Sequence, residues 1–179
     1  MKTLTLLRHA KSGWDDKVAR DVDRPLNAKG QRAAAVVGRH WRALGLEFDH
    51  VVASPAVRVH ETIGHLARGY GSDIAPVEDR RIYLASAVTL LDVVHGLPAD
   101  AERVLMVGHN PGLEDLVLML VPDTASDPLR DLAEEKFPTA CTAELTFDTD
   151  WAGVAQNNAT LSRFIRPRDI DPTLGPDAD

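Results

Sequence analysis

Short apolar runs alternate along the chain with longer stretches that have helical periodicity. The first run, LTLL at residues 4–7, hardly alternates between apolar and polar positions, which predicts a strand buried on both faces of a sheet. Similar runs predict further strands at residues 50–54, 74–78, 103–108, 141–147 and 160–165. The last two runs alternate more, and we expect them near an edge of the sheet.

Helices are predicted between these runs. Asn27 can cap a helix that ends at Gly45. Ser54 is predicted to cap a second helix, with Pro55 at its first helical position. The apolar stripe of the first helix consists of Ala33, Val37, Trp41 and Leu44.

Later in the chain, helices are predicted at residues 86–97 and from Pro111 onward, where the apolar stripe continues with Leu113, Leu116, Val117 and Leu120. Residues 122–138 are polar and rich in Pro and Asp, so we expect a long excursion there; whether it acts as a lid stays open.

Alternation of strands and helices predicts a three-layer α/β/α fold with a mostly parallel sheet and helices on both faces. We expect one domain over residues 1–168 and a flexible tail over residues 169–179.

Composition narrows the function classes. The 179 residues carry a net charge of −7 and no basic run, which argues against nucleic-acid binding. No apolar run approaches the roughly 20 residues needed to cross a bilayer, and charge interrupts the start of the chain too early for a signal peptide. The one cysteine, Cys141, is expected to be a small buried residue, and we expect a cytoplasmic protein.

Cations and imidazoles follow three of the predicted strands. The first strand runs into Arg8 and His9, the second is followed by Arg58, and the strand at residues 103–108 runs into His109. Ligands of open α/β sheets bind at the carboxyl ends of the strands, where helix N-termini also attract anions. Arg58 is expected in the first turn of a helix, where the helix dipole disfavours a cation, so we expect an anionic group beside it. These positions together predict an anion-binding site.

A metal or nucleotide site is not indicated. The chain has seven histidines, but none has H-x-H or H-E-x-x-H spacing, and one cysteine cannot build a thiolate site. The sequence GHNPG at residues 108–112 is neither a Walker nor a Rossmann fingerprint. We therefore expect no metal and no cofactor.

Four segments, LLRHAKS, RPLNAKG, SPAVRVHET and VGHNPG, resemble the histidine phosphatase superfamily and most closely its SixA-like phosphohistidine phosphatase branch. The resemblance covers most of the chain and implies a phosphoglycerate mutase-like fold. It implies that His9 is the nucleophile that becomes phosphorylated, and that Arg8, Arg58 and His109 complete the phosphate pocket. Ser12 and Asn110 stand beside these motifs, and we expect supporting roles in substrate binding for them.

The chemistry agrees with this resemblance. Guanidinium groups bind phosphoryl oxygens bidentately, whereas His9 must be neutral to attack, with its other ring nitrogen donating to an acceptor such as a backbone carbonyl. His109 is expected to donate to the phosphoryl group, most effectively when protonated.

The family's usual proton donor is missing from the segment DRRIYLASA at residues 79–87. Glu78, Asp79 or no residue at all can fill that role. Because an imidazole is a much better leaving group than an alkoxide, an absent acid favours phosphohistidine as the substrate.

Three hypotheses follow. The first is a phosphatase that removes phosphate from phosphohistidine in a carrier or phosphorelay protein. The second is a broad-specificity phosphomonoesterase of the same superfamily acting on small phosphorylated metabolites. The third is a non-catalytic phosphate-binding module. No membrane or nucleic-acid partner is expected for any of them.

Overall fold

The computed structural model describes residues 1–13 and 20–175. Its sheet contains six strands: β1 (Lys2–Arg8), β2 (His50–Ala53), β3 (Val77–Glu78), β4 (Arg103–Gly108), β5 (Thr142–Phe147) and β6 (Thr160–Ile165). The α-helices are α1 (Ala28–Leu44), α2 (Val57–Tyr70), α3 (Ala87–His95), α4 (Gly112–Leu120), α5 (Pro128–Glu135) and α6 (Pro167–Ile170). Four short 3-10 helices join them: η1 (Asp21–Asp23), η2 (Arg80–Ile82), η3 (Trp151–Gly153) and η4 (Pro172–Leu174).

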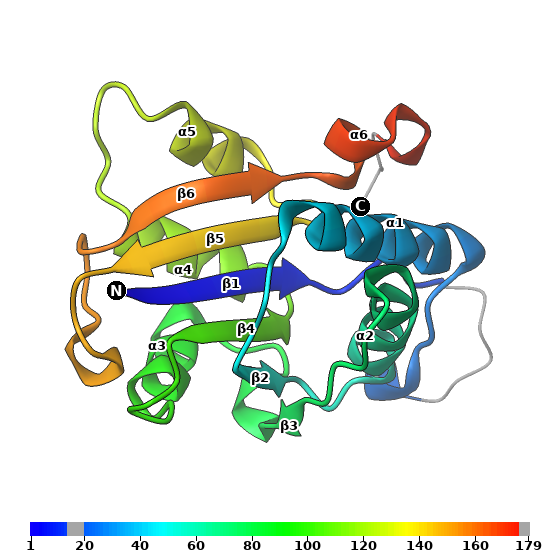
Figure 1. Ribbon diagram of the computed structural model, residues 1–179, viewed down its shortest axis with the longest axis horizontal. Coiled ribbons are helices and arrows are strands. Elements are labelled where there is room, and N and C mark those ends of the chain that lie inside the picture. The colour runs from blue at the N-terminus through cyan, green and yellow to red at the C-terminus, as the bar shows by residue number, and fades with distance from the viewer. Residues whose placement is uncertain (14–19, 176–179) are drawn as a thin grey trace.

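The strand order is β3-β2-β4-β1-β5-β6 (Figure 1). Strands β1, β2, β3 and β4 pair in parallel, whereas β5 is antiparallel to both β1 and β6. The carboxyl ends of β1, β2 and β4 consequently lie side by side at the same end of the parallel strands. This arrangement confirms the predicted α/β fold and the place of the two late strands beside the parallel part of the sheet.

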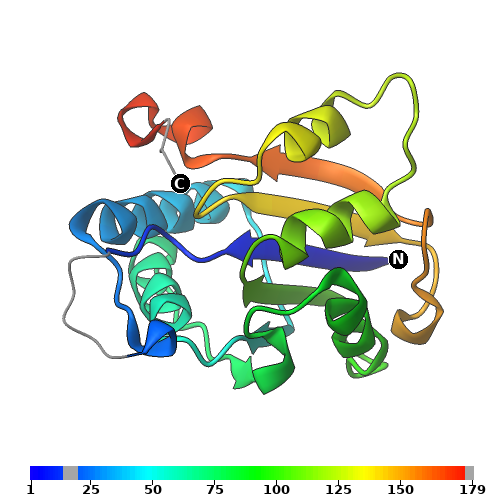
Figure 2. The same ribbon diagram turned by 180° about the vertical axis from the view of Figure 1, so that it is seen from behind.

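Helices cover both faces of the sheet, which makes three layers (Figures 1 and 2). On one face, apolar residues of α3, α4 and α5 form a core with Leu4 and Leu6 of β1. On the other face, α1 and α2 form a second core with Leu7 of the same strand. β1 is thus buried on both faces, as its unbroken apolar pattern predicts.

Two glycines allow α1 and α2 to pack closely against each other. A Cβ atom on Gly38 of α1 would lie 2.1 Å from the carbonyl oxygen of Leu66, and one on Gly69 of α2 would lie 2.1 Å from that of Ala35. Real side chains never approach a carbonyl oxygen this closely, so larger residues would push the helices apart. The close approach fixes α2, and with it the residues that α2 carries to the sheet edge.

Two predicted boundaries are wrong. The strand predicted at residues 74–78 contains only Val77 and Glu78, which are exposed and pair with β2 at the sheet edge. The second helix begins at Val57, with Ala56 rather than Ser54 at the N-cap position. The Ser54 hydroxyl instead accepts a hydrogen bond from the Ala56 amide and contacts His109, a partner that is remote in sequence.

The excursion at residues 122–138 folds over α4 and β6. It contains α5, whose N-cap Asp127 accepts a hydrogen bond from the Arg130 amide. The Arg130 side chain is buried and donates to the carbonyls of Val121 and Leu118. Phe137, at the end of the excursion, is fully buried. These contacts join the excursion to the main core.

The chain continues in regular elements beyond residue 168. Pro167 and Leu174 are both buried, and Leu174 belongs to the core that α1 and α2 form. The last four positions of the expected tail, residues 176–179, lie outside the described residues.

Cys141 is fully buried, as expected, and burial raises its pKa. None of the helices in the described part of the chain has both the length and the apolar character needed to cross a bilayer.

Candidate active site

His9 follows β1 in a tightly held backbone segment. Its amide donates to the carbonyl of Gly108, 3.1 Å away at the end of β4. The Ala140 amide donates to the His9 carbonyl at 3.0 Å. The next amide, that of Ala10, donates to the Thr62 hydroxyl of α2 at 2.9 Å, and this hydroxyl donates in turn to the Arg58 carbonyl at 2.6 Å. Strand β4 and helix α2 therefore fix the position of His9.

The His9 ring is held in one tautomer. Its Nδ1 lies 2.7 Å from the carbonyl oxygen of Ala10, and because a carbonyl only accepts, Nδ1 carries the proton. The neutral ring therefore has its lone pair on Nε2. The pKa of His9 is lowered to about 3, mainly by burial. The Ala10 hydrogen bond raises this pKa, whereas the nearby His109, Arg8 and Arg58 lower it. This is the neutral, oriented imidazole that nucleophilic attack requires.

His109 follows β4 and faces His9, with 5.2 Å between the ring centroids. Its Nδ1 lies 3.3 Å from Nη2 of Arg58, which can only donate, so the His109 proton is on Nε2. Nε2 donates to the Ser54 hydroxyl at 2.8 Å. Burial, and then the charge of Arg58, lower the pKa of His109 to about 3. In the absence of an anion His109 is neutral, and both of its ring nitrogens already have partners.

Arg58 lies in the first turn of α2 and is 3% exposed. Its Nη1 donates to the Asp21 carbonyl at 2.9 Å, and its Nη2 donates to the Asp21 carboxylate at 3.0 Å. Asp21 is thus the anionic group expected beside this cation. The Nε atom of Arg58 is buried and has no hydrogen-bond partner among the described residues. A buried donor of this kind is a suitable contact for a phosphoryl oxygen.

Arg8 is held by the end of the excursion. Its Nη1 donates to the carbonyl of Phe137 at 3.0 Å, and the same carbonyl accepts from the side-chain amide of Asn110 at 2.9 Å. The Asn110 side-chain oxygen accepts from the amide of Glu114 in α4. The positive charge of Arg8 contributes to the lowered pKa values of His9 and His109. Both polar groups of the Asn110 side chain have intramolecular partners.

Asp21 and Tyr83 join the site without having been predicted. The Tyr83 hydroxyl donates to the Asp21 carboxylate, and the Tyr83 ring packs edge-on against His109 with 5.4 Å between centroids. Arg24 donates to Asp21 at 2.9 Å and to the Ser12 hydroxyl at 2.6 Å. Ser12 therefore contacts Arg24 of the RPL segment. Tyr83 lies in the segment at residues 79–87, where the sequence lacks the usual acid. The missing acid is the one feature of the sequence that draws attention to this residue.

The two carboxylates considered as proton donors are paired elsewhere. Glu78 forms an ion pair with His60 on the outside of the sheet edge. Asp79 accepts from the backbone amide and the guanidinium of Arg81, and hydrogen bonding from Arg81 lowers the pKa of Asp79. Within the described residues, neither carboxylate forms a hydrogen bond or an ion pair with His9 or His109.

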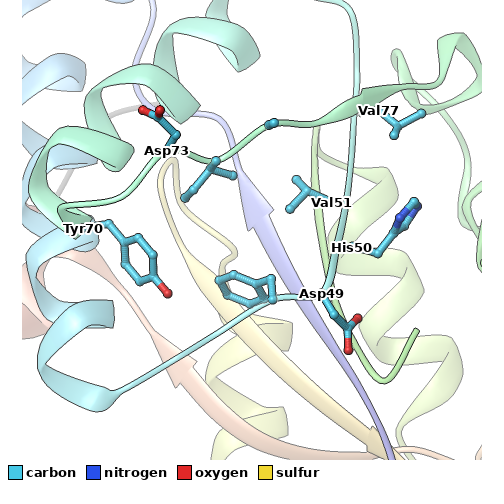
Figure 3. Close-up of a pocket in the computed structure, with 9 residues that line it drawn as sticks. Asp49, His50, Val51, Tyr70, Asp73 and Val77 are labelled. Carbon is cyan, nitrogen blue, oxygen red and sulfur yellow. The ribbon is translucent and has the colours of Figure 1, made fainter. Parts of the chain in front are cut away.

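A separate hollow of about 240 Å³ lies at the beginning of β2, at the other end of that strand from Ser54 and Arg58. Figure 3 shows its labelled polar residues, Asp49, His50, Tyr70 and Asp73, spread around it rather than converging. Asp49 already binds the amides of Glu102 and Arg103. The hollow therefore lacks the convergent polar groups found at the strand ends. No group of three or more potential metal ligands occurs within residues 1–13 and 20–175.

Comparisons with known proteins point to one family. The model of the histidine phosphatase superfamily (branch 1) matches residues 4–82. An uncharacterized protein of Mycobacterium tuberculosis is 33% identical over 163 residues, which cover 90% of this chain and 100% of that protein.

Two solved structures are similar over nearly their whole length. A candidate phosphohistidine phosphatase SixA of Nakamurella multipartitia has 31% identity and a TM-score of 0.79, with 93% of this chain and 96% of that chain covered. A second candidate SixA, of Agrobacterium tumefaciens, has 28% identity and a TM-score of 0.74, with 93% and 98% covered. The chain therefore belongs to the histidine phosphatase superfamily, in its SixA-like branch.

Proposed function

We propose that the protein is a phosphohistidine phosphatase that forms a phospho-His9 intermediate and releases inorganic phosphate. Membership of the histidine phosphatase superfamily supports phosphatase activity in general. The observation that carries the proposal is the state of His9: Nδ1 donates to the Ala10 carbonyl, which leaves the lone pair of Nε2 available beside Arg58 and His109.

In the first step, Nε2 of His9 attacks phosphorus in line with the bond to the substrate nitrogen. That bond breaks, and its electron pair returns to the substrate imidazole, which leaves as a neutral ring when its other nitrogen carries a proton. The phosphorylated His9 ring keeps its Nδ1 proton on the Ala10 carbonyl. Arg8 and Arg58 neutralise charge on the phosphoryl oxygens, with the buried Nε of Arg58 as one donor.

In the second step, water attacks phosphorus. The bond to His9 breaks, its electron pair returns to Nε2, and the protons of the water leave with phosphate or pass to solvent. His9 recovers its starting state without gaining or losing a proton at Nδ1. A bound phosphoryl dianion raises the pKa of His109. Because Nδ1 faces Nη2 of Arg58, the protonated ring must turn away from Arg58 to donate to the phosphoryl group.

The proposed substrate class follows from the leaving group. The sequence-based candidates for a general acid are paired with His60 and Arg81, and Asp21 is held ionised by its donors. A phosphohistidine needs less proton donation than an alkyl phosphate does. The proposed partner is therefore a phosphohistidine-containing carrier or phosphorelay protein, and a cytoplasmic location fits that partner and the single buried cysteine.

A direct test compares the wild type with His9→Ala on a protein labelled with ³²P at histidine. We expect turnover and transient labelling of the wild type, because the phosphoryl group passes through His9, and neither from His9→Ala. His40→Ala removes a histidine of α1 and should behave like the wild type.

Arg58→Ala should lower the rate by roughly 10²–10³-fold, as removal of one preorganised donor does in other enzymes. A labelled substrate that stays phosphorylated with the wild type would refute the proposal.

A phosphomonoesterase is the second candidate, and Glu114 is the observation that favours it. Burial raises the pKa of this carboxyl, which lies in the first turn of α4 and accepts from the Phe137 amide at 3.1 Å. If Glu114 protonates an alkoxide, Glu114→Gln will abolish hydrolysis of alkyl phosphates. If the protein is instead a phosphohistidine phosphatase, we expect it to turn over phosphohistidine faster than alkyl phosphates. Glu114→Gln should then keep the wild-type turnover of phosphohistidine. A non-catalytic binding module would leave His9 unlabelled when the wild type is incubated with the ³²P-labelled protein.

A further inference from the structure

Asp21 is an unexpected residue in a site built for an anion. Its carboxylate lies 3.0 Å from Nη2 of Arg58, the same atom that lies 3.3 Å from Nδ1 of His109. A phosphoryl group held by Arg58 therefore has a fixed carboxylate one guanidinium away. Two like charges at such a distance repel each other, so the position of Asp21 has a cost for anion binding.

The Asp21 carboxylate is charged and still accessible. Burial alone would raise its pKa, but hydrogen bonds from Tyr83, Arg24 and Arg58 lower that pKa well below its usual range. Its Oδ1 accepts from Arg24, and its Oδ2 accepts from Arg58 and Tyr83. A carboxylate has about four acceptor positions, and the side chain is 40% exposed, so Asp21 can accept a further hydrogen bond.

Positioning of Arg58 does not by itself explain a carboxylate here. The backbone carbonyl of Asp21 already accepts from Nη1 of Arg58 at 2.9 Å. A neutral asparagine could accept from Nη2 and from Tyr83 through its side-chain oxygen, although its NH2 group would then replace Oδ1 as the partner of the Arg24 guanidinium. The distinctive property of Asp21 is its negative charge beside Arg58, the proposed ligand of the transferred phosphoryl group.

We propose that Asp21 selects substrates by the charge that flanks the phosphoryl group. Its carboxylate repels substrates with a second anionic group beside the phosphate, and it accepts a hydrogen bond from a leaving group that bears a proton on nitrogen. The proposal rests on the proposed function, because a protonated phosphohistidine ring is such a leaving group, whereas a carboxylated phosphometabolite is not.

Binding of non-hydrolysable phosphonates tests the selection without requiring turnover. The probes are phenylphosphonate and its 4-carboxy and 4-aminomethyl derivatives, which differ mainly in charge. Calorimetry gives a Kd for each probe with the wild type, Asp21→Asn and the matched control Asp79→Asn, whose carboxylate pairs with Arg81 outside the site. We expect Asp21→Asn to shift the affinity ratio toward the carboxy probe by roughly tenfold, as for a unit charge lost at short range. Asp79→Asn should leave the ratio unchanged.

A purely structural role predicts a different result. If Asp21 only holds Arg58, Asp21→Asn weakens all three probes in the same proportion, and the proposal is overturned. No binding of any probe to the wild type would overturn it as well. Tyr83→Phe removes a donor but keeps the charge, so it should retain the wild-type ratio; a shift like that of Asp21→Asn would contradict the proposal. Failure of the proposed function would appear separately, as a wild type that does not dephosphorylate phosphohistidine.

Discussion

At the scale of single residues, the site depends on two neutral histidines whose tautomers are fixed by different partners. His9 uses a backbone carbonyl to hold its proton, whereas His109 uses the Ser54 hydroxyl and accepts from Arg58. Burial contributes most to the lowered pKa of each ring. The charges of Arg8 and Arg58, the proposed phosphate ligands, lower the pKa of His9 further.

Thr62 connects the two halves of this arrangement, because its hydroxyl accepts from the Ala10 amide and donates to the Arg58 carbonyl. Thr62→Val keeps the shape but leaves the buried Ala10 amide without its acceptor. We expect a loss of about 1–3 kcal/mol in the free energy of unfolding and a lower kcat for the phosphohistidine substrate. Urea unfolding and steady-state kinetics measure the two effects.

Thr142→Val is the matched control, because the buried Thr142 hydroxyl accepts from the Trp41 indole rather than from the His9 segment. It should lower stability without changing kcat. An equal fall of kcat in both variants would show that Thr62 has no special connection to the site.

At the scale of elements, local pattern predicts much of the fold and part of the site. The apolar runs place Arg8, His9 and His109 at neighbouring strand ends, because parallel strands share one carboxyl edge. Asp21 and Tyr83 could not be predicted in this way, since they lie in or beside short 3-10 turns that have no hydrophobic period. Ser54 has the sequence of a helix cap, and only the folded chain brings His109 to its hydroxyl.

The contact between α1 and α2 gives a prediction at this scale. Gly38→Ala puts a methyl group against the Leu66 carbonyl, and we expect a destabilisation of about 1–3 kcal/mol. In Gly64→Ala, on an exposed position of α2, the added Cβ has nothing within 4 Å, and we expect a gain of roughly 0.5–1 kcal/mol from helix propensity. Thermal denaturation of both variants checks the opposite signs. Destabilisation by both would contradict the prediction that Gly64 of α2 has room for a side chain.

At the scale of the whole molecule, the neutral histidines make stability depend on pH. The pKa values of His9 and His109 fall from 6.5 in the unfolded chain to about 3 in the folded protein. The unfolded chain therefore binds more protons below pH 6.5, and the free energy of unfolding falls as the pH decreases through that range.

Between about pH 7.5 and about pH 5, we expect each of these histidines to lower the free energy of unfolding by roughly 2 kcal/mol. Urea denaturation at the two pH values measures the change. The double variant His9→Gln, His109→Gln lacks both groups and should lose most of this dependence. An unchanged slope in the double variant would show that other groups are responsible.

The central position of β1 has a consequence for how activity is lost on heating. This strand lies between β4 and β5 and contributes leucines to both cores, so its backbone amides should exchange with solvent only when the whole sheet opens. Arg8 and His9 are attached directly to its end. Fraying of peripheral loops therefore leaves His9, the proposed nucleophile, in place, and thermal inactivation should coincide with global melting.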